Sequence, residues 1–158
     1  MEEISPENIA ALESRYRATA ITVLGQIIFT IILTISVLLF APTATNSISQ
    51  QTLITLWTAI IFLAVGAFVL RRMFFRWDRL KDITTLKGIS GLLGTLQNNA
   101  IVLAVFATLL TVVGCVITIL SGATFEAIRA EIVSLIVFLI NFPRKSVWSR
   151  IVASMEKV

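Results

Sequence analysis

The stretch ATAITVLGQIIFTIILTISVLLFA, residues 18–41, contains no charged side chain in 24 consecutive positions. A helix needs about 20 apolar residues to cross the hydrocarbon core of a bilayer. The one amide side chain in the stretch is that of Gln26, and Pro42, which a helix interior tolerates poorly, follows directly. The sequence therefore predicts a transmembrane helix over residues 18–41.

Three further apolar stretches, at residues 52–70, 99–120 and 124–142, are also of membrane-spanning length. Charged residues make up 14% of the chain, whereas a soluble domain usually contains about a quarter. We predict an all-α fold: a single polytopic membrane domain, residues 1–158, in which four transmembrane helices form an up-down bundle. A cytoplasmic loop, 71–98, and a cytoplasmic tail, 143–158, complete it.

The fourth span differs from the others because it contains charge. Arg129 and Glu131 would each cost about 2.5–3.5 kcal/mol at the centre of a spanning helix. The alternative is a shorter interfacial piece, since residues 132–142 alone are too few to cross. We favour a full span over 124–142, because the basic stop after Pro143 would otherwise lie on the wrong side of the membrane.

Lys and Arg gather on one side of the predicted spans. Of the 13 such residues, 12 lie in the N-terminal segment, the loop 71–98 or the tail 143–158, and Arg129 is the exception. Short segments rich in Lys and Arg remain in the cytoplasm. We therefore predict a multi-pass protein of the cell (inner or plasma) membrane with both termini cytoplasmic.

The segment before the third span also shows helical spacing. Leu86, Ile89, Leu93 and Leu96 recur every three or four residues and run on into the apolar stretch. This pattern predicts a cytoplasmic extension of the third helix, which the three glycines of LKGISGLLG weaken by about 1 kcal/mol each.

The two halves of the chain resemble each other weakly. An offset of 80 aligns Leu12 with Leu92, and an offset of 71 aligns Trp77 with Trp148. The pattern is that of two parallel hairpin repeats related by an axis along the membrane normal. Chance matching of apolar residues is the alternative.

The residue types that support most enzyme chemistry are scarce. The chain has no histidine and one cysteine, Cys115, within an apolar run. Histidine is the commonest general base and metal ligand, and a single cysteine makes neither a disulfide nor a zinc site. We predict no cofactor, no metal site and no enzymatic activity, with Cys115 as a small packing residue.

Small residues form a stripe along the third span, at alternating spacings of four and three residues. That period fits left-handed helix packing, and small side chains let helices approach closely in lipid. A shorter line is predicted on the second span. The two sets are Ala100, Ala104, Ala107, Thr111, Gly114 and Thr118 on the third span, and Ala59 and Gly66 on the second. We predict packing inside the bundle, with an oligomer interface as the alternative.

The charged residues of the fourth span suggest an ion pathway, with Glu131, Arg129, Thr30, Gln26 and Thr111 as its candidate residues. Counting 1.5 Å per residue from the cytoplasmic side places Glu131, Thr30 and Thr111 in one layer near mid-bilayer, with Gln26 one turn away. Buried carboxylates in membranes usually face the bundle interior or a water-filled cavity. The alternative is that the outer surface wets Glu131 and Arg129 together with Glu126, three residues before Arg129.

A second predicted contact is with lipid. Basic residues next to a membrane bind anionic headgroups, a simpler explanation than nucleic-acid binding, which we do not expect. The candidate headgroup residues are Arg71, Arg72, Arg76, Arg79, Lys81, Arg144 and Lys145.

Two functions remain open. The first is a non-enzymatic membrane subunit that acts in the assembly or structure of a membrane complex or a homo-oligomer. The second is a small proton- or cation-coupled transporter or channel that uses Glu131. An intramembrane enzyme has little support from the residues present.

Overall fold

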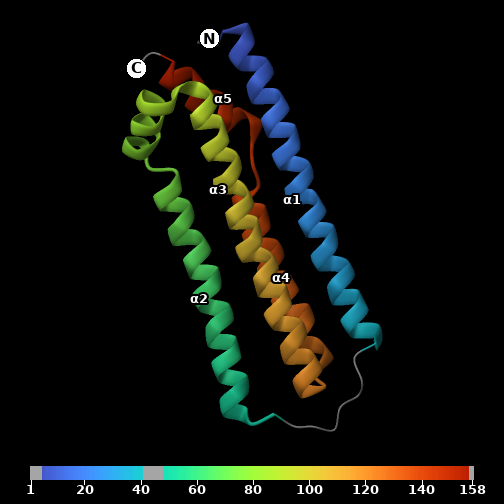
Figure 1. The fold of residues 1–158 in the computed structure, drawn as a ribbon. Coiled ribbons are helices and arrows are strands. Elements are labelled where there is room, and N and C mark those ends of the chain that lie inside the picture. The colour runs from blue at the N-terminus through green and yellow to red at the C-terminus, as the bar shows by residue number, and fades with distance from the viewer. Residues whose placement is uncertain (1–4, 41–47, 157–158) are drawn as a thin grey trace.

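A computed structural model describes residues 5–40 and 48–156, and within them every regular element is a helix. The described residues form five helices (Figure 1): α1 (Pro6–Phe40), α2 (Gln50–Phe74), α3 (Trp77–Ser121), α4 (Thr124–Asn141) and α5 (Lys145–Met155). The prediction of an all-α fold is confirmed. The predicted end of the first span at Ala41, and Pro42 after it, lie outside the described residues.

The described part contains three helices, α1, α2 and α3, that are long and apolar enough to cross a membrane. These are the features of a membrane protein. The fourth predicted span corresponds to α4, which is 18 residues long and carries Glu126, Arg129 and Glu131.

The four long helices run alternately up and down (Figure 1). α3 and α4 lie side by side at the centre, and α1 and α2 each pack on both of them. Among the described residues α1 and α2 do not contact each other. The bundle is therefore a central α3–α4 hairpin flanked by α1 and α2.

Local sequence explains where several helices begin and end. Ser49 caps α2, because its side chain accepts a hydrogen bond from the Thr52 N–H. Gly122 ends α3 in the left-handed region, with φ 69°, and its N–H bonds to the Thr118 carbonyl. α3 therefore ends at Ser121, one residue beyond the predicted span 99–120.

The predicted loop 71–98 is helical almost throughout. α2 continues to Phe74, and α3 begins at Trp77. The predicted extension before the third span is confirmed, but it bends at Gly88, whose φ of 66° and ψ of −174° are not helical. A positive φ costs glycine little, so residues 77–87 turn away from the rest of α3 (Figure 1).

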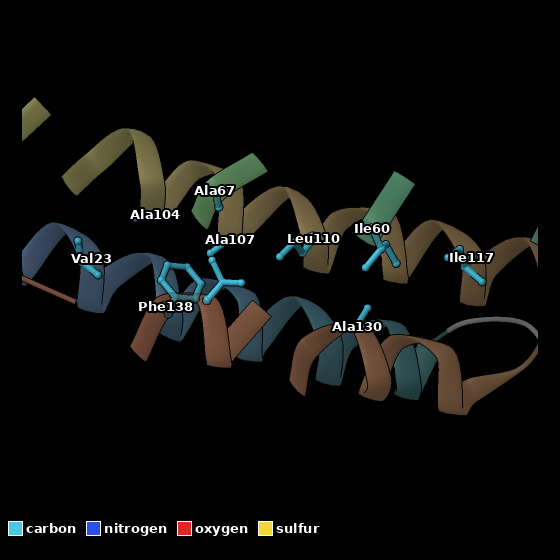
Figure 2. Packing of buried hydrophobic residues seen from close by; sticks show 10 residues of the cluster. Val23, Ile60, Ala67, Ala104, Ala107, Leu110, Ile117, Ala130 and Phe138 are labelled. Atoms are coloured by element: carbon cyan, nitrogen blue, oxygen red, sulfur yellow. The ribbon is translucent and has the colours of Figure 1, made fainter. Parts of the chain in front are cut away.

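The buried apolar side chains form two clusters. The bundle core lies between the long helices (Figure 2) and consists of Val23, Ile60, Ala67, Ala104, Ala107, Leu110, Ile117, Ala130, Val137 and Phe138. The terminal core joins α1, α3 and α5, and consists of Leu12, Leu80, Leu92, Leu93, Leu96, Trp148, Ile151, Val152 and Met155.

The terminal core lies at one end of the bundle, where both described chain ends are found (Figure 1). Polar contacts there join α1 to the C-terminal segment. Lys145 donates to Glu13 over 3.0 Å, and Glu156 accepts hydrogen bonds from the Ser5 N–H and the Asn8 amide. The predicted tail 143–158 therefore contains a docked helix. We call this end of the bundle the basic end.

Candidate functional site

The carboxylate of Glu131 lies inside the bundle. Glu131 is only 7% exposed, and its neighbour Ala130 is fully buried. α4 approaches α3 so closely here that a Cβ atom on Gly114 would lie 2.1 Å from the Ala130 Cβ. A further bond between the two helices, from the Ser134 hydroxyl to the Ala107 carbonyl, is 2.7 Å long. The close α3–α4 contact therefore holds Glu131 against its neighbours.

Three threonine hydroxyls donate to this carboxylate. The distances are 3.1 Å from Thr30 to Oε1, 3.3 Å from Thr34 to Oε2 and 2.6 Å from Thr111 to Oε2. Thr30 and Thr34 belong to α1 and Thr111 to α3, so the cluster ties α4 to both helices. We call Glu131 and these three threonines the Glu131 cluster.

The structure brings together Glu131, Thr30 and Thr111 of the sequence-predicted pathway residues. Thr34 was missing from that set, although it follows Thr30 by one helical turn and so shares its face. Gln26 does not join the cluster, because its Oε1 accepts a hydrogen bond of 3.3 Å from Thr108 instead. Gln26 and Thr108 form a separate polar link between α1 and α3.

Arg129 lies away from the cluster. Its side chain is 64% exposed and forms a 3.0 Å ion pair with Glu126, three residues earlier. Glu126 is itself 8% exposed and also accepts a 2.7 Å hydrogen bond from the Trp57 indole of α2. The alternative, in which water at the outer surface reaches all three charged residues, therefore fits Arg129. It does not fit Glu126 and Glu131, because the helices bury both.

The Glu131 cluster supplies only oxygen atoms around one carboxylate. Such a set suits a proton or a hard cation, because hard cations prefer oxygen ligands. No group of three or more His, Cys, Asp or Glu side chains suited to a metal occurs in the part of the chain that the structure describes. No described Lys or Arg pairs with Glu131.

The predicted small-residue stripe of α3 faces the bundle interior. All six of its residues, from Ala100 to Thr118, are buried. On α2, Ala59 is exposed and so does not pack inside the described bundle, which leaves it the oligomer-interface alternative. Gly66 is half-buried with space around it. α2 packs instead through Ile60 and Ala67, each one residue further along and so about 100° around the helix.

The seven candidate headgroup residues all lie at the basic end. Arg71 donates to the Ile140 carbonyl in the last turn of α4. The Arg79 guanidinium lies 5.1 Å from the centre of the Phe74 ring, and Arg76 pairs with Asp78 at 3.7 Å. Lys145 pairs with Glu13. The remaining three, Arg72, Lys81 and Arg144, are exposed.

Two carboxyl groups at this end have perturbed acidity. The hydrogen bond from Lys145 lowers the pKa of Glu13, and the hydrogen bond from the Asn8 side chain lowers the pKa of Glu156. Both shifts favour the ionised form of the carboxyl group.

No protein-family model, curated protein or solved structure matches this chain.

Proposed function

We propose that the protein is a non-enzymatic membrane subunit that crosses the bilayer four times, with both termini cytoplasmic, and assembles with copies of itself or with partner membrane proteins. In this placement the basic end lies at the cytoplasmic leaflet of the inner or plasma membrane.

Two observations support α4 as the fourth span. Its 18 residues rise about 27 Å, close to the hydrocarbon thickness of about 30 Å. The carboxylates of Glu126 and Glu131 have hydrogen-bond partners within the bundle, which reduces the cost of placing them in lipid. Four crossings return the chain to the basic end, as the positive-inside rule requires.

The proposed pair of parallel hairpin repeats has mixed support. In each half a long helix and its antiparallel partner lead into a short helical segment, residues 77–87 in the first half and α5 in the second. Leu12 and Leu92 are both buried in the terminal core, but Trp148 is buried while Trp77 is 50% exposed.

The observation that carries the assembly proposal is an unpartnered face of α3. Its side chains are 37–45% exposed and alternate in spacing by four and three residues, as in helices that pack in left-handed pairs. The face consists of Val105, Leu109, Val112, Val116 and Ile119. It lies about 140° around the helix from the buried small-residue stripe, at 100° per residue.

A photo-crosslinking side chain at Val112 should test this assembly in the native membrane. We expect ultraviolet light to produce protein adducts, either of two copies or with a partner subunit, because position 112 lies at the centre of the face. Denaturing gels and mass spectrometry of the adducts would identify the neighbour.

The matched control places the same crosslinker at Phe62, which is 73% exposed on α2. We expect only lipid adducts there. An absence of protein adducts at position 112, or equal yields at both positions, would contradict assembly through α3.

A second candidate function, proton or cation transport, is favoured by the Glu131 cluster, since it holds a buried carboxylate without a cationic partner among the described residues. If this carboxylate carries the ion, Glu131→Gln should lower proton- or cation-linked flux into liposomes by about tenfold or more.

Glu126→Gln is the control for that experiment. It neutralises the other buried carboxylate of α4, which already pairs with Arg129, and should leave any flux largely intact. Flux that is absent from the wild-type protein, or unchanged in Glu131→Gln, would remove this candidate and leave the subunit role.

A further inference from the structure

Two hollows meet between α2 and α4 at the basic end. The first, here the basic pocket, has a volume of about 180 Å³ and is lined by Arg71, Arg144, Phe75, Trp148 and Asn141, among others. The second, here the apolar groove, has a volume of about 280 Å³ and is lined by Ala64, Val65, Phe68, Val137, Ile140 and Asn141. Asn141 borders both, so the two hollows are adjacent.

The basic pocket is suited to an anion. Arg71 is held over it by its bond to the Ile140 carbonyl, which uses one of the five guanidinium donors and leaves the others available. Arg144 is exposed and lines the same pocket. Among the residues that the structure describes, no acidic side chain lines either hollow. Paired guanidinium groups bind phosphate through charge-assisted, often bidentate hydrogen bonds.

The apolar groove leads from this pocket toward the middle of the bundle. Its α2 residues precede Arg71 by three to seven positions, a distance of about 5–10 Å along the helix axis. Apart from Asn141, every lining residue is apolar. A cationic pocket next to an apolar groove along the helices matches the two parts of a phospholipid.

We propose that the basic pocket and the apolar groove together bind one anionic phospholipid, with its phosphate between Arg71 and Arg144 and an acyl chain along the groove. A glycerol headgroup fits this pocket better than a headgroup with an ammonium group. The two arginines would repel an ammonium group, and no described carboxylate lines the pocket to pair with it. The site rests on the proposed membrane placement, in which α2 and α4 end at the same leaflet, and not on the proposed assembly.

Native mass spectrometry of the detergent-solubilised protein tests the site by counting bound lipids. The probes are dioleoyl phosphatidylglycerol and dioleoyl phosphatidylcholine, which share their acyl chains. We expect one tightly bound phosphatidylglycerol per chain, and about tenfold weaker binding of this lipid by the double variant Arg71→Gln/Arg144→Gln, because charged hydrogen bonds to the phosphate are lost.

The matched control is Arg17→Gln/Arg150→Gln, which removes the same charge from exposed residues outside the pocket and outside the seven candidate headgroup residues. It should bind phosphatidylglycerol like the wild type. Equal losses in the two double variants would overturn the site in favour of general electrostatic attraction, and unchanged binding in the pocket variant would overturn it as well.

The groove is tested separately by Val65→Trp, which places a bulky side chain in the groove without changing charge. Ile61→Trp is its control, since Ile61 is similarly exposed, one turn away and outside the groove. We expect weaker phosphatidylglycerol binding only in Val65→Trp. Equal binding by the two tryptophan variants, or displacement of the lipid by equimolar glycerol phosphate, would overturn the acyl part of the site. The same spectra report the copy number, so a monomer that keeps its lipid would contradict self-assembly while supporting the site.

Discussion

Replacing Gly114 by alanine should separate α4 from α3 and destabilise the bundle by about 2–3 kcal/mol. The added Cβ would lie 2.1 Å from the Ala130 Cβ, and both atoms are fixed to helix backbones, so one helix must shift. A shift of α4 also strains the 2.6 Å bond between Thr111 and Glu131 and the 2.7 Å bond from Ser134. Unfolding in mixed micelles, followed by the loss of helical circular dichroism, would measure the effect.

Two variants isolate the contact between the helices. Gly66→Ala should be neutral or slightly stabilising, because a Cβ at Gly66 meets nothing within 4 Å and alanine has the higher helix propensity. The double variant Gly114→Ala/Ala130→Gly moves the methyl group from α4 to α3 and should recover most of the lost stability. An unaffected Gly114→Ala, or a double variant no more stable than the single one, would contradict this packing.

The sequence predicted the packing of α3 well and that of α2 poorly, for a physical reason. Small residues at a fixed period are informative where two backbones meet closely, as Gly114 and Ala130 do. On α2 the contact is made by Ile60 together with Ala67. Nothing in the composition of that helix separates an apolar side chain that faces lipid from one that faces α3.

The candidate site was only partly predictable. A depth count along each span placed Glu131, Thr30 and Thr111 at one level, and the structure brings them together. The rotation of each helix about its axis is set by packing, which a depth count ignores. Gln26 therefore faces Thr108 instead of Glu131. The hydrogen bond between Trp57 and Glu126 could not be predicted from the sequence, which indicates only that a buried indole N–H needs some partner.

Substituting Trp148 by alanine should release α5 from the basic end. Trp148 is 1% exposed, the largest side chain of the terminal core, and packs edge-on against Tyr16 of α1 with ring centres 6.0 Å apart. Such a truncation costs about 3–5 kcal/mol. α5 has only 11 residues, too few for a stable isolated helix, so the loss should open this segment locally and leave the four long helices assembled.

Thiol labelling measures this opening directly. In a Cys115→Ser background, a cysteine at Val152, which is fully buried in the terminal core, should react with a water-soluble maleimide roughly 100-fold faster or more when Trp148 is alanine. Trp77→Ala is the matched control, because it removes the same side chain from the same end of the bundle at a position that is 50% exposed and outside the terminal core, and it should leave the rate unchanged. Equal labelling rates with and without Trp148 would mean that α5 docks through its polar contacts, Lys145–Glu13 and the hydrogen bonds of Glu156, and not through burial of the indole.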